Sequence, residues 1–136
     1  MRKYIPLLLM MILALLVSAC GRGTVSDVCI GRQYSGIYTQ KDVDDAIQLA
    51  INYFRNEFEG CKLLEIAYVG DEEWKAFEEW ADQYGVDQVI ILVSSFETGP
   101  DGGDGSLNPN DTYRNWQWVL GRSNGGKWKH LTHGYG

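Results

Sequence analysis

The sequence lacks a surplus of positive charge and a long apolar run. Its 136 residues carry 12 Lys and Arg against 18 Asp and Glu, a formal charge of −6, which excludes binding to nucleic acid through bulk positive charge. The uninterrupted apolar run 7–17 spans 11 residues, well short of the ~20 that cross a bilayer as a helix. The length leaves room for one domain and a targeting segment.

The chain also lacks the common catalytic motifs. No glycine-rich phosphate loop follows a strand pattern, and neither Gly-x-Ser-x-Gly nor Cys-x-x-Cys occurs. The two histidines, His130 and His133, stand three residues apart in a strand pattern. We therefore expect them on opposite faces, unable to chelate a metal together unless the chain bends there. The Asp and Asn oxygens of loop 100–111 are an alternative calcium site, but the loop lacks the EF-hand spacing and turn chemistry explains the same residues. We therefore predict no metal, and no cofactor is predicted either.

The first twenty residues have the three parts of a secretory signal: a basic start, an apolar run and small residues before a break. The stretch Val17-Ser18-Ala19-Cys20 resembles the bacterial lipoprotein signal. That resemblance implies removal of a signal peptide, residues 1–19, and a diacylglycerol on Cys20 whose new amine is acylated, for instance with palmitate. It predicts a lipid-anchored protein on the extracytoplasmic face of the cell membrane. The alternative is an ordinary secretory signal with an incidental cysteine.

Residues 20–37 predict a lipidated flexible stalk, because glycines and polar residues occur there without sustained periodicity. Cys29 lies in this segment and Cys61 in the body. A Cys29–Cys61 disulfide would close a loop of 33 residues and contribute roughly 3–4 kcal/mol in the chain-entropy model. Two free thiols are the alternative, and the sequence does not decide between them.

Residues 38–136 predict a single α+β domain. The stretch Thr39–Asp42 has a capping-box pattern, and apolar residues follow at helical spacing. Cys61–Val69 suits a strand, and Asp71 suits the cap of a second helix. The apolar stripe of the first helix comprises Val43, Ile47, Ala50, Ile51, Phe54 and Phe58. The buried side expected for the second comprises Trp74, Phe77, Trp80, Ala81 and Tyr84.

Three strand patterns complete the chain: Gln88–Phe96, Thr112–Arg122 and Lys127–His133. The Asn124-Gly125 pair between the last two is a strong hairpin signal, because both central residues of such a turn need a positive φ. The order predicts N-terminal helices packed on a curved antiparallel sheet of about four strands that ends in a β-hairpin.

The final hairpin pattern resembles a known family. Trp116-Gln117-Trp118-Val119-Leu120, followed by Gly125-Gly126-Lys127-Trp128-Lys129-His130, is similar to the last hairpin of the nuclear-transport-factor-like (SnoaL-like, cystatin-like) cone superfamily. The resemblance covers about residues 38–136 and implies a cone fold, which hosts enzymes, ligand binders and assembly domains alike. With the lipoprotein signal, the chain resembles small surface lipoproteins of unknown function from anaerobic Gram-positive bacteria.

Large aromatic side chains are the candidates for lining a pocket in such a cone. The alternative is that they are buried in its hydrophobic core. They are Tyr53, Tyr113, Trp116, Trp118 and Trp128. SnoaL-like enzymes often pair a histidine with Asp or Tyr, which makes His130 a weak candidate for a general base. No acid stands where the sequence would bring it to His130, and a rim histidine is the alternative.

These observations predict a membrane-anchored extracytoplasmic lipoprotein that acts as a ligand-binding or protein-interaction module. Its expected partners are the membrane, through the anchor, and a cell-surface protein or a small apolar ligand. Exposed aromatics would support a homodimer. The rival hypothesis is a small cone enzyme that uses His130 as general base on a nonpolar substrate.

Overall fold

The computed structural model describes residues 23–31 and 34–135. The predicted signal peptide 1–19 and the predicted lipidation site Cys20 lie outside the described residues. The elements in chain order are β1 (Cys29–Ile30), α2 (Gln40–Glu57), β2 (Lys62–Tyr68), a 3-10 turn (Asp71–Glu73), α3 (Trp74–Tyr84), β3 (Gln88–Glu97), β4 (Thr112–Arg122) and β5 (Lys129–Tyr135).

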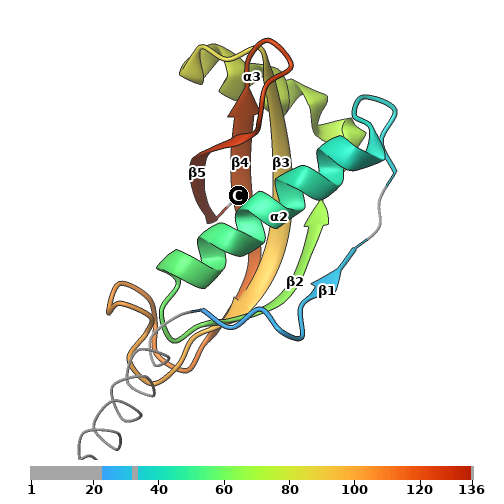
Figure 1. The fold of residues 1–136 in the computed structure, drawn as a ribbon. Helices are drawn as coiled ribbons and strands as arrows, with labels where there is room; N and C mark the ends of the chain where they lie inside the picture. The colour runs from blue at the N-terminus through green and yellow to red at the C-terminus, as the bar shows by residue number, and fades with distance from the viewer. Residues whose placement is uncertain (1–22, 32–33, 136) are drawn as a thin grey trace, which may run out of the picture.

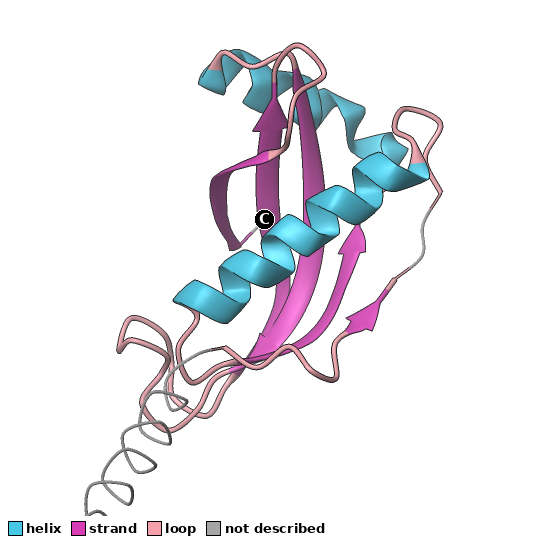
Figure 2. Ribbon diagram, in the orientation of Figure 1, coloured by secondary structure: helices cyan, strands magenta, loops and turns pink. Residues whose placement is uncertain are grey.

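The chain is an α+β protein whose helices pack on one mixed sheet with the strand order β1-β2-β3-β4-β5. Strands β2 to β5 form an antiparallel meander, and the short β1 adds a parallel edge strand beside β2. Figure 1 shows α2 crossing one face of the sheet and α3 lying across one of its ends. The turn after β4 and the loop 98–111 before it lie at opposite ends of the sheet (Figure 2).

Helix α2 forms where the sequence predicts it. The Thr39 side chain accepts from the backbone N–H of Asp42, and the Asp42 side chain accepts from the backbone N–H of Thr39, which closes the capping box. All six residues of its predicted apolar stripe are buried. Gly60, with φ +72°, follows the helix in the left-handed region that glycine adopts without cost.

Helix α3 departs from the prediction at its start and on its buried side. Asp71 does not cap it; its carboxylate instead accepts hydrogen bonds from the Tyr68 hydroxyl and from the hydroxyl of Ser35. Phe77 is the buried residue of this helix, whereas Trp74 is 46% exposed and Tyr84 40%. The helix lies across the end of the sheet, so two of the five residues of the expected buried side stay exposed.

Residues 23–31 are not the free stalk that the sequence predicts. The Thr24 backbone N–H donates to the Cys61 carbonyl at 2.8 Å, and β1 pairs with β2. Gly23 sits so close to α2 that a Cβ there would lie 2.5 Å from the Phe54 carbonyl oxygen. Backbone pairing with an otherwise open sheet edge outweighs the low order that glycine-rich composition favours.

The two described cysteines are free thiols, Cys29 exposed and Cys61 buried. Cys29 faces Glu65 in the parallel register, while Cys61 lies before β2 begins. Four residues of extended chain separate their positions by about 13 Å, beyond the ~7 Å that a disulfide spans between Cα atoms. Of the two alternatives that the sequence left open, the structure has the unbridged one.

The core lies between α2 and the sheet, and Trp118 at its centre is fully buried. The β4–β5 turn has the predicted chemistry, with φ +56° at Asn124 and +64° at Gly125. Among the described residues, no helix combines the length and apolar character needed to cross a membrane.

Candidate functional site

Among the hollows that border α2, two lie near opposite ends of the helix. The first, which we call the junction hollow, lies between the start of α2 and the β4–β5 turn and has a volume of about 640 Å³. The second, the histidine pocket, lies between the end of α2, the loop 98–111 and strands β4 and β5, with a volume of about 250 Å³. The two differ in how their polar groups are paired.

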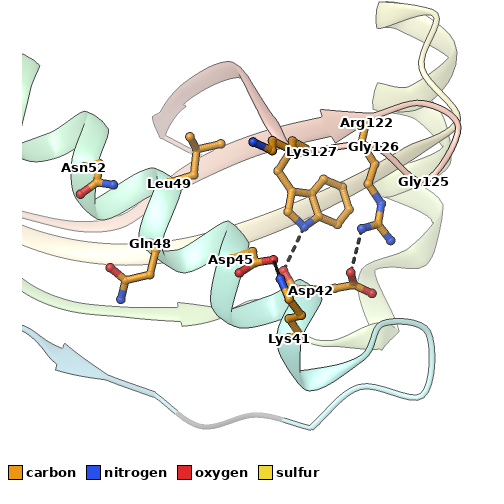
Figure 3. Close-up of a pocket in the computed structure, with 11 residues that line it drawn as sticks. Lys41, Asp42, Asp45, Gln48, Leu49, Asn52, Arg122, Gly125, Gly126 and Lys127 are labelled. Atoms are coloured by element: carbon orange, nitrogen blue, oxygen red, sulfur yellow. Dashed lines mark hydrogen bonds and ion pairs between the residues drawn. The ribbon is translucent and has the colours of Figure 1, made fainter.

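The junction hollow is built around Asp42. Its carboxylate accepts from Arg122 Nη1 at 2.8 Å, and its backbone carbonyl accepts from Trp128 Nε1 at 2.9 Å (Figure 3). The guanidinium of Arg122 also donates to Gln88 Oε1 at 2.8 Å and stacks 4.2 Å from the centroid of the Trp128 ring. These contacts tie the first turn of α2 to β3, β4 and the end of the hairpin turn.

The charges of the junction are largely matched within the protein. The hydrogen bond from Arg122 holds the pKa of Asp42 down at about 2, helped by hydrogen bonds from Thr39. Lys41 pairs with Asp45 on the exposed side of α2. We interpret this hollow as a structural contact between helix and hairpin, because its buried polar groups already have partners.

In the histidine pocket, a bulge in β5 overturns the predicted geometry of the two histidines. Val119 faces Thr132 but Leu120 faces His130, so Leu131 is an extra residue in β5. The extra residue shifts the alternation of side chains by one position. His130 and His133 therefore lie on the same face, with His130 Nε2 and His133 Nδ1 2.9 Å apart. The sequence prediction of opposite faces assumed a regular strand, and the bulge makes that prediction wrong.

The histidine pair is packed under α2. The Tyr53 ring stacks on the His130 ring with 4.1 Å between centroids, and the ring centroids of Trp118 and His133 lie 5.2 Å apart. Burial lowers the pKa of both imidazoles, and the neighbouring His133 lowers that of His130 further. Both rings are therefore neutral at pH 7 and share one hydrogen bond.

The surroundings of His130 differ from those of an activated base. Its Nε2 is engaged with His133 rather than with a carboxylate, and its lowered pKa makes it a weaker proton acceptor. Tyr53 contacts it through the ring face, not through the hydroxyl. Histidine bases are usually oriented by a hydrogen-bonded acid or carbonyl, and the described residues give His130 none.

Trp116 supplies the most informative atom of this region. It lines the histidine pocket together with His133, and the residue is 9% exposed. Its indole Nε1 has no hydrogen-bond partner among the residues that the structure describes. An N–H group left in this state costs about 1–3 kcal/mol relative to a paired one.

The structure brings some of the predicted site residues together and separates others. Tyr53, Trp116 and Trp118 gather with the histidine pair. Tyr113 stacks on Phe96 in the core, and Trp128 lies at the junction hollow. Sequence reasoning missed the remaining walls of the pocket, because they come from the end of α2, its following turn and loop 98–111. They are Glu57, Phe58, Cys61, Gly103, Asp104, Ser106 and Leu107.

The described residues contain no group of three or more His, Cys, Asp or Glu side chains that could hold a metal ion. Comparisons with protein-family models, with curated proteins and with solved structures return no match for this chain.

Proposed function

We propose that this protein is a lipid-anchored extracytoplasmic binding module whose small-molecule site is the histidine pocket. The observation that carries the proposal is a pocket of about 250 Å³ lined by the aromatic residues Tyr53, Phe58 and Trp116 together with His133. The buried Nε1 of Trp116 has no hydrogen-bond partner among the described residues. Buried donors without acceptors are rare in native proteins and call for an explanation. A ligand that shifts the Trp116 ring on entering the pocket and accepts from this N–H would supply one.

The composition of the pocket fits a ligand site. Apolar surface from Tyr53, Phe58 and Leu107 alternates with polar groups from His133 and Trp116, the mixture that orients small molecules in proteins. The pocket is also shaped by rigid elements, since α2, β4 and β5 supply three of these five residues. A binding role is favoured over catalysis because no acid among the described residues is hydrogen-bonded to the histidine pair.

The anchor and the fold family are further parts of the proposal. The Val17-Ser18-Ala19-Cys20 pattern supports attachment of the chain to a membrane through acyl groups on Cys20. The order helix, strand, helix and three strands over 40–135 supports a relationship to the nuclear-transport-factor-like cone.

Ligand binding is tested with the full-length protein in detergent micelles and a library of small metabolites, by thermal shift. We expect compounds that raise the melting temperature of the wild-type protein and lose most of that effect in Trp116→Phe. Trp80→Phe, which changes a partly buried tryptophan on α3 instead, should respond as the wild type does. Hits that act equally on all three proteins would contradict the proposed site.

The anchor is tested by metabolic labelling in a bacterial host with radioactive palmitate. We expect the wild-type chain to incorporate label and to fractionate with membranes, and Cys20→Ala to do neither. Cys29→Ala serves as the matched control, because it removes another cysteine of the N-terminal region. Label that persists in Cys20→Ala would refute lipidation at this residue.

A further inference from the structure

The link between the proposed lipid anchor and the folded body is short. Cys20 stands three positions before Gly23, where the described part of the chain begins. Three peptide steps span about 11 Å at most, whatever conformation they take. A free stalk over the whole of residues 20–37, as the sequence predicts, would reach about 60 Å. The packing of residues 23–31 on the sheet therefore brings the body close to any surface that holds Cys20.

The body is held firmly at the point where this link enters it. The Gly23 backbone N–H donates to the Arg55 carbonyl at 3.0 Å. The Thr24 carbonyl accepts from the Leu63 backbone N–H at 2.9 Å, and Thr24 forms a parallel bridge with Lys62. These partners belong to the end of α2 and the start of β2, so the link enters the body at one fixed place.

The histidine pocket lies at this same end. Cys61, whose carbonyl accepts from the Thr24 N–H, is one of its lining residues. Loop 98–111 packs on the same turn, because a Cβ at Gly103 would lie 3.5 Å from the Cys61 Sγ. The exposed residues of the lining are Glu57, Asp104 and Ser106. The rim of the pocket is therefore beside the place where the link enters.

Helix α3 lies at the opposite end of the body. Figure 1 shows the blue start of the described chain at the end that holds loop 98–111, and α3 at the other end of the sheet. The seven residues of β2, Lys62–Tyr68, separate the two ends by about 20 Å. Residues 71–87 carry seven acidic side chains and one lysine, so an anionic lipid surface repels this end.

We infer that the anchor holds the protein end-on, with loop 98–111 and the rim of the histidine pocket beside the lipid surface and α3 turned away from it. The bilayer is the partner of the first end, and α3 is the end that other proteins meet. The inference rests on the proposed lipidation of Cys20 and adds an orientation that lipidation alone does not give. A ligand of the pocket then arrives through the layer of solvent next to the lipid headgroups.

The test measures how close each end lies to the bilayer. Full-length protein, lipid-modified in a bacterial host, is reconstituted into phosphatidylcholine vesicles with and without a nitroxide on the headgroup, a quencher that acts only at short range. A bimane dye is attached at Asp101→Cys in loop 98–111 or at Glu79→Cys in α3. Both carry Cys29→Ala, which removes the exposed thiol. Both dye positions are exposed and each loses one carboxylate, so the variants are matched. We expect quenching to be at least threefold stronger at position 101.

A longer link is the control for the orientation. Inserting about twelve Gly and Ser residues between Arg22 and Gly23 adds roughly 20 Å of reach. We expect quenching at position 101 to fall at least twofold, because the body can then leave the surface. Quenching at position 79 should change little, since α3 already lies far from the headgroups.

The outcomes separate this inference from the proposed anchor. Equal quenching at the two positions, or stronger quenching at position 79, would overturn the orientation while the anchor stands, as long as the protein floats with the vesicles. Unchanged quenching at position 101 after the insertion would also overturn it, because the short link would not set the distance. If the wild-type protein neither incorporates palmitate nor floats with the vesicles, the anchor and the orientation both fail.

Discussion

The two ends of α2 differ in how their polar groups are paired. At the start of the helix, Asp42 takes hydrogen bonds from Arg122 and Trp128, and Arg122 is further held by Gln88. At the other end, the buried N–H of Trp116 has no acceptor within the part of the chain that the structure describes. The end near Asp42, which we call the matched end, holds helix and hairpin in place. Breaking any of its contacts would leave a polar group without its hydrogen-bond partner. At the end near Trp116, which we call the unmatched end, the donor has no partner among the described residues to lose. Pairing it with a ligand would therefore break no described contact within the protein.

The largest effect should come from Arg122→Ala at the matched end. The change leaves the Asp42 carboxylate, whose side chain is only 23% exposed, without its ion-pair partner and removes the guanidinium from the Trp128 ring. We expect the free energy of unfolding to fall by about 3 kcal/mol. Urea unfolding followed by tryptophan fluorescence measures it.

Lys127→Ala is the control, because Lys127 lines the same hollow and forms no ion pair among the described residues. Its effect should stay within about 0.5 kcal/mol. Equal losses in the two variants would mean that the matched contacts do not set the stability of this end.

The next largest effect should be a loss of folding stability in acid, through protonation of Asp42. The pKa of Asp42 is about 2 in the folded chain and near 3.9 in an unfolded one. A lowered folded pKa gives stability that is fully present above about pH 4 and is lost as the pH falls toward 2. Denaturation of the wild type and Asp42→Asn across this window should show a shallower decline in the variant. Parallel curves would contradict the pairing.

The histidine pair gives a smaller pH effect at higher pH. Burial lowers the pKa of His130 and His133 below that of an unfolded histidine, near 6.5. The unfolded chain therefore takes up protons first, and stability declines as the pH falls below about 6.5. These are the only histidines of the sequence, so the decline between pH 6.5 and 5.5 should disappear in a His130→Gln/His133→Gln double variant. A decline that persists would place its origin elsewhere.

The same two ends show what the sequence could predict. The start of α2 was predictable because the capping box of Thr39 and the apolar stripe are local patterns. The β4–β5 turn was predictable because Asn124-Gly125 is a local turn signal. The partner of Arg122 was not, since Asp42 stands 80 positions away and only the packing of the hairpin on α2 brings them together.

The histidine pocket was harder to predict for a physical reason. Strand alternation places His130 and His133 on opposite faces, and one extra residue, Leu131, reverses that. A bulge is fixed by how two strands pair, so a single strand does not show it. Of the aromatic residues predicted to line a pocket, Tyr53 and Trp116 do line one, whereas Trp118 is fully buried in the core. Edge pairing of residues 23–31 was equally invisible, because it depends on the open edge of β2.

The smallest predicted effect is a difference between two identical substitutions in one strand. Trp118 Nε1 donates to Ser94 Oγ at 2.8 Å, whereas Trp116 Nε1 donates to nothing described. Changing each tryptophan to phenylalanine removes the same atoms, so the loss of ring volume largely cancels when the two variants are compared. Trp118→Phe should destabilise the protein by about 1 kcal/mol more than Trp116→Phe, because it alone breaks a buried hydrogen bond. If urea unfolding gives equal losses, the Trp116 N–H has a partner in solution, and the argument that this atom awaits a ligand loses its basis.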